Sequence, residues 1–190
     1  MDFDAGQDAG LNKKNPYIQC PIFETEHFTL RLVSMDDAAA LLHCYSDVFA
    51  RPFFNSDTCT GDFFFDTYDQ MSVCIKAWLD CYSKEEFVRF SIVDKGSNLA
   101  VGTIEMFGMI GKYKTTRGIL RLDIASSYEK ASILRELFSV FINSFFDLFA
   151  VHQIVTKAIP EALERVDALK GLGFVPYDFP EREHYWVSSR

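Results

Sequence analysis

The stretch ILRLDIASSYEKASILRELFSVFINSFFDLFAVHQIVTKAIP, residues 119–160, decides the fold. Its first six residues alternate between apolar and polar side chains, which is the period of a strand with one buried face. The face opposite the apolar one carries Arg121 and Asp123. A largely apolar helix is predicted to follow as far as Phe149, and residues 152–158 predict another strand. A strand, a helix and a strand in this order predict two parallel strands joined by a right-handed crossover.

On both sides of this unit the sequence predicts further strands and helices. Upstream, strands are predicted at 28–32, 87–93 and 99–107, and helices at 38–45 and 67–82. Downstream, a helix is predicted to begin at Pro160 and to end at Gly171 and Gly173, with strands at Phe174 and 184–188. Residues 1–16 predict a loose tail and 17–190 a single domain. The predicted class is α/β (α+β), with one mixed sheet and helices on its faces.

Composition limits the classes of function. The 190 residues carry a formal net charge of -8, and the basic residues are scattered among acids, which argues against nucleic acid as a partner. The five cysteines show no C-x-x-C or zinc spacing, so no metal site is predicted. Free thiols favour a reducing compartment, and the N-terminus has no apolar signal region, so we expect a cytoplasmic protein. The most apolar window, 133–150, contains Arg135, Glu136 and Asp147, which argues against a membrane span.

Three segments carry a resemblance to a known family. ETEHFTLRLVSMDDAAALL at 24–42 resembles the opening strand and helix of the RimJ/RimL-type ribosomal-protein N-acetyltransferases, which belong to the GNAT superfamily. VGTIEMFG at 101–108 is similar to the central strand of that family, and FAVHQIVTKAIPEALERVDALKGLGF at 149–174 to its C-terminal segment. The resemblance implies the GNAT fold, whose mostly antiparallel central sheet contains one parallel, splayed strand pair. That pair would be 119–125 and 152–158.

The resemblance also implies a site for acetyl-CoA between the two splayed strands. Backbone N–H groups at the start of the next helix would bind the diphosphate, because a helix N-terminus offers unpaired donors and a partial positive charge. The implied cofactor-binding residues are Ile124, Ala125, Ser126, Tyr128, Glu129, Lys130, Ala131, Ser132 and Ile133.

Several residues depart from the family pattern at this loop. The pattern is Arg/Gln-x-x-Gly-x-Gly/Ala, whereas this chain has Glu129, Ser132 and Leu134. An acid repels a diphosphate, and a side chain in place of glycine keeps the backbone away from it. Ser126-x-x-Glu129 also has the form of a capping box, in which a helix satisfies its own N–H groups. Downstream, Ala162 and Arg165 stand where the family usually has Asn and Ser.

Asp123 and Glu105 are the candidate catalytic bases, because each is an acid on a predicted central strand. For both, an ion pair with a basic neighbour is the alternative role. Tyr128 is either a cofactor contact or a packing residue at the helix start. Structural roles are favoured for His152, Tyr185 and Trp186, although some family members use a Tyr near the last strand to protonate the leaving thiolate. The aromatic residues Phe53, Phe54 and 63–65 either line an acceptor pocket or pack in the core or at a dimer face.

Two functions follow and stay open at this point. The first is an N-acyltransferase, which would move an acetyl group from acetyl-CoA to a primary amine of a small molecule or a protein N-terminus by direct attack. The second is a non-catalytic ligand-binding or interaction domain that has lost the cofactor loop. A homodimer is compatible with either. If acetyl-CoA is bound at this loop, Glu129→Gln and Ser132→Gly should each strengthen its binding.

Overall fold

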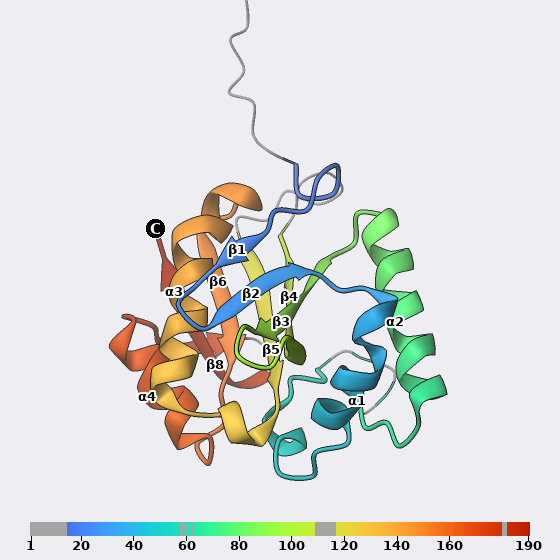
Figure 1. The fold of residues 1–190 in the computed structure, drawn as a ribbon. Coiled ribbons are helices and arrows are strands. Elements are labelled where there is room, and N and C mark those ends of the chain that lie inside the picture. Colours follow the sequence, from blue (N-terminus) through green and yellow to red (C-terminus); the bar gives the residue numbers. More distant parts are fainter. Residues whose placement is uncertain (1–14, 58, 60, 62, 109–116, 180–181) are drawn as a thin grey trace, which may run out of the picture.

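The computed structural model describes residues 15–57, 59, 61, 63–108, 117–179 and 182–190. Within them one eight-stranded sheet has the order β1-β2-β3-β4-β5-β6-β8-β7 (Figure 1). Its strands are β1 (Phe23–Glu24), β2 (Phe28–Leu32), β3 (Val88–Asp94), β4 (Leu99–Phe107), β5 (Arg117–Ile124), β6 (Gln153–Lys157), β7 (Val175–Phe179) and β8 (Arg182–Ser189). Neighbouring strands are antiparallel except β5 and β6, which are parallel. The predicted single mixed, mostly antiparallel sheet is therefore confirmed.

Helices cover both faces of this sheet. The α-helices are α1 (Ala38–Tyr45), α2 (Tyr68–Ser83), α3 (Ala131–Leu148) and α4 (Leu163–Gly171), and short 3-10 helices are η1 (Met35–Asp37), η2 (Arg51–Phe53) and η3 (Ser126–Tyr128). Figure 1 shows α3 and α4 on one side of the sheet and α1 and α2 on the other. A sheet whose two faces are both covered can bury charged side chains as well as apolar ones, provided that they are paired.

The parallel strands β5 and β6 separate soon after they meet. Their pairing runs from Arg117 opposite Gln153 to Ile119 opposite Val155, although β5 continues to Ile124. Beyond this point β6 keeps its pairing with β8, up to Lys157 opposite Tyr185. The splayed parallel pair that the resemblance implied is therefore confirmed, with α3 as the crossover.

The main core lies between the sheet and α3. Leu120, Leu122 and Ile124 on β5 face this core and are each 1% exposed. Phe141 and Phe145 on α3 are fully buried, and their ring centroids lie 4.5 Å apart. The predicted burial of this helix is confirmed, because its apolar residues cover the whole face that meets the sheet.

Helix starts differ most from the prediction. A 3-10 turn occupies Ser126–Tyr128, and α3 begins only at Ala131. The predicted Ser126–Glu129 capping box is wrong, because the Glu129 carboxylate binds another side chain. Helix α4 begins at Leu163, since Pro160 lies in a turn before it. The sequence prediction also missed β1, which is two residues long. Residues 1–14 of the predicted tail lie outside the described residues.

Candidate functional site

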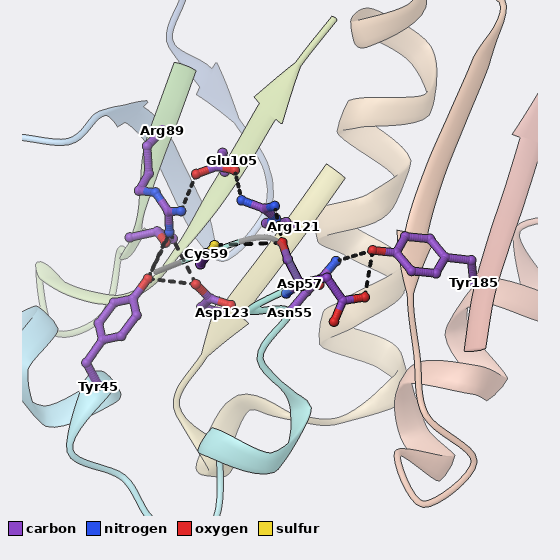
Figure 2. Close-up of polar contacts among 10 residues, drawn as sticks. Tyr45, Asn55, Asp57, Cys59, Arg89, Glu105, Arg121, Asp123 and Tyr185 are labelled. Carbon is purple, nitrogen blue, oxygen red and sulfur yellow. Dashed lines mark hydrogen bonds and ion pairs between the residues drawn. The ribbon is translucent and has the colours of Figure 1, made fainter. Parts of the chain in front are cut away.

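Charged side chains cross the sheet face that α1 covers (Figure 2). Arg89 on β3 is 1% exposed and lies at the centre of this network. Its Nη1 donates to Tyr45 Oη at 3.1 Å and to Thr103 Oγ1 at 2.9 Å, and it contacts Asp123 Oδ2 at 3.2 Å. Its Nη2 forms an ion pair with Glu105. Arg89 therefore joins both acids that the sequence nominates as catalytic bases.

Strand register explains why Glu105 is paired twice. Glu105 on β4 lies directly opposite Arg89 on β3 and Arg121 on β5. Its Oε1 accepts from Arg121 Nη1 at 2.7 Å, while Oε2 binds Arg89. Opposite charges at facing positions of adjacent strands attract directly. Both carboxylate oxygens of this 2% exposed residue are thus held by guanidinium groups.

Asp123 has a different electrostatic environment. Burial raises the pKa of its carboxyl, and the charge of Arg89 and a hydrogen bond from Tyr45 Oη at 2.9 Å only partly offset this. Its Oδ1 has no hydrogen-bond partner among the described residues. Burial also raises the pKa of the Tyr45 phenol, and the nearby Asp123 charge adds to the effect, so Tyr45 stays neutral and donates. A raised pKa is what a general base needs, but Asp123 is only 2% exposed.

The network continues to the end of β6. Arg121 Nη2 donates to the backbone oxygen of Asp57 at 2.9 Å, and Asp57 Oδ1 pairs with Lys157 Nζ at 2.7 Å. Tyr185 Oη donates to Asp57 Oδ2 at 3.1 Å and accepts from Asn55 at 3.2 Å (Figure 2). Ion pairs between described residues of this network join three cations, Arg89, Arg121 and Lys157, to three carboxylates, Glu105, Asp123 and Asp57.

A hollow of about 560 Å³ opens beside this end of the network. It is lined by Val48, Arg51, Pro52, Phe53, Phe54, Ser56, Lys157 and Ile159. Phe53 and Phe54 line this hollow, and Phe54 also packs in the smaller core around α1 and α2, so an acceptor pocket stays a prediction. Phe63 and Phe65 instead pack against the smaller core that α1 and α2 form.

A buried ion pair occupies the expected cofactor loop. Glu129 accepts from Arg165 twice, from Nε to Oε1 and from Nη2 to Oε2, each at 2.7 Å. Arg165 Nη1 donates to the backbone oxygens of Phe53 at 2.9 Å and Leu122 at 3.0 Å. The two side chains are 7% and 2% exposed. Because Leu122 lies on the splayed part of β5, the guanidinium fills space that the resemblance assigns to acetyl-CoA.

Two other carboxylates bind backbone N–H groups of the same loop. Glu164 Oε2 accepts from the N–H of Ala131, the first residue of α3, at 2.6 Å. Asp47 Oδ2 accepts from the N–H of Ser126 at 2.8 Å. Burial pushes the pKa of Asp47 upward, but its hydrogen bonds outweigh this and hold the pKa below its ordinary value. Two of the N–H donors that a diphosphate would use, those of Ser126 and Ala131, are thus bonded to the chain's own acids.

The remaining predicted cofactor residues do not converge on an anion site. Ile124 is in the main core, and Tyr128 Oη donates to Asp94 at 3.1 Å. Lys130 and Ser132 are exposed. With an acid tied to a buried guanidinium and an N–H capped by Glu164, the residues present do not fit the diphosphate of acetyl-CoA.

The other nominated residues have structural contacts. Trp186 Nε1 donates to the backbone oxygen of Ala158 at 3.2 Å. His152 is exposed, and its backbone oxygen accepts from the N–H of Arg190 at 3.0 Å. Among the described residues no group of His, Cys, Asp and Glu could hold a metal ion. Nor does any helix within the described part of the chain have the length and apolarity to cross a bilayer.

Sequence reasoning missed Arg165 and Tyr45 as members of the site. Arg165 was noted only as a departure from the family pattern. A usable signal existed, because Glu129 and Arg165 are departures of opposite charge in two segments that the fold brings together. The sequence around Tyr45 gave no such signal, since Tyr45 is the last residue of α1 and the apolar pattern of that helix predicts only core packing.

Comparisons with solved structures agree with this topology. The ribosomal-protein-S5-alanine acetyltransferase of Vibrio fischeri matches with a TM-score of 0.70 and 20% identity, over 89% of this chain and 96% of that one. RimJ of Mycobacterium smegmatis, solved with CoA-disulfide, matches with a TM-score of 0.72 and 15% identity, over 88% and 86%. A GNAT-family acetyltransferase of Bacillus anthracis matches with a TM-score of 0.66 and 14% identity, over 89% and 98%.

The chain therefore has the GNAT fold, and the structures that it resembles are GNAT-type acetyltransferases. No protein-family model matches the sequence, and no curated protein is significantly similar to it. At these identities the likeness is one of fold, so function has to be argued from the site.

Proposed function

We propose that this chain is a non-catalytic, ligand-binding domain with the GNAT fold that does not bind acetyl-CoA at the α3 N-terminus. The observation that carries this proposal is the buried Glu129–Arg165 pair between α4, η2 and β5. It puts an acid where the related fold needs donors, and a guanidinium where the related fold leaves an opening.

Separating Glu129 from Arg165 costs a large amount of free energy. Removing one partner of a buried ion pair costs roughly 3–5 kcal/mol, because the other charge stays buried and unpaired. A cofactor that had to separate Glu129 from Arg165 would lose roughly 10²- to 10⁴-fold in affinity at 1.36 kcal/mol per factor of ten. The carboxylate of Glu164 adds a second competitor, since it would have to leave the N–H of Ala131 as well.

The candidate bases support the same proposal. Glu105 has both oxygens on arginines, and Asp123 is shared between Arg89 and Tyr45. A general base has to come within hydrogen-bond reach of the amine proton that it removes. We therefore assign both carboxylates the structural role of holding the buried arginines.

One observation favours the alternative, an N-acyltransferase. The strands β5 and β6 separate after Ile119 and Val155, which is the backbone arrangement that the acetyltransferase resemblance implies. If acetyl-CoA enters by displacing Arg165, Asp123 with its raised pKa is the candidate base. The acceptor would then be a primary amine of a small molecule or a protein N-terminus.

Calorimetric titration with acetyl-CoA separates the two functions. Wild type, Glu129→Gln, Ser132→Gly and the double variant are compared at one salt concentration. Ser132 is exposed, so its change tests the loop without disturbing the core. We expect no binding by the wild type or by Ser132→Gly. Saturable micromolar binding by the wild type, with release of CoA when an amine is added, would overturn the proposal.

A further inference from the structure

A groove separates α4 from the hairpin of β7 and β8. Its helical wall is one stripe of α4, with residues three and four positions apart: Leu163, Val166 and Lys170. The residues on the wall that the hairpin forms are Pro176, Asp178, His184 and Trp186. None of the described lining residues lies on β5 or α3, so the groove is separate from the expected cofactor loop. Its volume of about 730 Å³ is within the range of sites for small molecules.

The middle of the groove is apolar and held in place. Trp186 is 8% exposed and belongs to the main core, and its Nε1 donates to the backbone oxygen of Ala158 at 3.2 Å. Pro176 on β7 lies directly opposite Trp186, and Val166 packs against the same core from α4. An indole ring with aliphatic neighbours can bind the apolar part of a ligand, and a floor fixed in this way needs little rearrangement to do so.

Lys170 places a positive charge beside this floor. Its Nζ lies 5.9 Å from the ring centroid of Trp186. Lys170 is exposed and forms no ion pair with another described residue. Because an ammonium has three donors, Lys170 can bind the carboxylate of a ligand that lies on the indole.

Asp178 places a negative charge further along the hairpin. It is two residues beyond Pro176, which lies opposite Trp186, and two residues of a strand span about 7 Å. Asp178 is also exposed, and no cation among the described residues forms an ion pair with it. Its carboxylate can therefore accept hydrogen bonds from the ammonium of a ligand. The groove thus presents a cation beside the indole and an anion roughly 7 Å along the strand.

We propose that this groove binds a small zwitterion whose carboxylate and ammonium are separated by an apolar chain. The carboxylate binds Lys170, the ammonium binds Asp178, and the chain lies on Trp186 and Val166. A ligand with both charges matches both ends of the groove, whereas a ligand with one charge leaves one end unmatched. The inference rests on the proposed binding function and names its ligand class.

The probe is 6-aminohexanoate, because its methylene chain separates an ammonium from a carboxylate. Hexanoate and hexylamine are the matched comparisons, since each keeps the chain and one of the charges. Each ligand is titrated into the full chain at about pH 7 and constant salt, and the indole N–H signals of the two tryptophans are followed. We expect the signal of Trp186 to shift, while that of Trp78, which is buried in the smaller core, stays in place. The zwitterion should bind about threefold more tightly than either comparison, which is the effect of one exposed ion pair.

Two single variants separate the two ends of the groove. Lys170→Gln should weaken binding of 6-aminohexanoate and hexanoate about threefold, but it should not weaken binding of hexylamine. Asp178→Asn should weaken binding of 6-aminohexanoate and hexylamine by a similar factor, but it should not weaken binding of hexanoate. Lys130→Gln, at an exposed lysine outside the groove, should change nothing. This crossed pattern is decisive, because damage to the fold would weaken binding of all three ligands alike.

Three results would each overturn the inference: equal affinities of the three ligands, equal losses for all of them in both variants, or no shift of the Trp186 signal with 6-aminohexanoate at millimolar concentration. Acetyl-CoA is titrated into the same samples. Micromolar binding of acetyl-CoA refutes the proposed function whatever the zwitterion does, whereas silence toward both acetyl-CoA and 6-aminohexanoate refutes only the zwitterion site.

Discussion

Replacing Glu129 by Gln should destabilise the fold substantially. The substitution keeps the size of the side chain but leaves the 1% exposed Arg165 with two backbone oxygens and no counter-charge. Breaking a buried pair in this way costs roughly 3–5 kcal/mol. A glutamine oxygen can still accept one hydrogen bond, so we expect about 3 kcal/mol, the lower end of that range. Since each kcal/mol moves Tm by roughly 2–4 °C at this chain length, Tm should fall by about 6–12 °C.

An exposed ion pair between α3 and α4 provides the control. Arg135 on α3 and Asp167 on α4 lie 2.8 Å apart, but their side chains are 47% and 65% exposed. Asp167→Asn should therefore cost less than about 1 kcal/mol. Urea unfolding at pH 7, followed by circular dichroism, measures both variants. A loss below about 1 kcal/mol for Glu129→Gln, equal to that of the exposed pair, would show that Arg165 is solvated and that the expected opening is not closed.

Three further predictions concern stability. Phe145→Ala should cost about 3–5 kcal/mol, because its fully buried ring packs in the main core, and a loss below about 1 kcal/mol in urea unfolding would place α3 at the periphery. Burial pushes the pKa of Asp37 upward, but Arg31 and neighbouring donors outweigh this effect and lower the pKa. The stabilisation by Asp37 is therefore present above the pKa of the unfolded chain and is lost as the pH falls through the pKa of the folded protein. The unfolding free energies of wild type and Asp37→Asn should converge on acidification below about pH 4, and a constant difference between them would contradict this. Gly102→Ala should cost about 1–3 kcal/mol or more, because the added Cβ would overlap the backbone oxygen of Asp123. Gly118→Ala should cost less in the same assay, because the atom nearest to its Cβ is the flexible end of the Met106 side chain, and equal costs would contradict the difference.

Local periodicity of apolar residues was enough to predict most helices and strands of the fold. The alternation in 119–124 predicted which face of β5 meets the core, and the apolar coverage of the following helix predicted its burial. Both depend on residues a few positions apart, so they can be read without knowing the partners. Strand 99–107 was predicted with its observed bounds, because a turn at 94–98 marks its beginning. Helix starts were less accurate, since whether Glu129 caps its own helix depends on whether a guanidinium from another segment lies closer.

The order of elements in the sequence predicted one mixed sheet with a parallel strand pair. The resemblance to the family implied that this pair is splayed, and it showed that the residues at the expected cofactor loop depart from the family pattern. Only the tertiary structure decided what those departures do. Glu129 and Arg165 are 36 residues apart, and Glu105 meets Arg89 and Arg121 through strand register. The sequence gives the charge of a side chain, but the residue with which that charge pairs depends on which strands are neighbours and on their register. That arrangement turns an acid in the expected diphosphate loop into half of a buried ion pair.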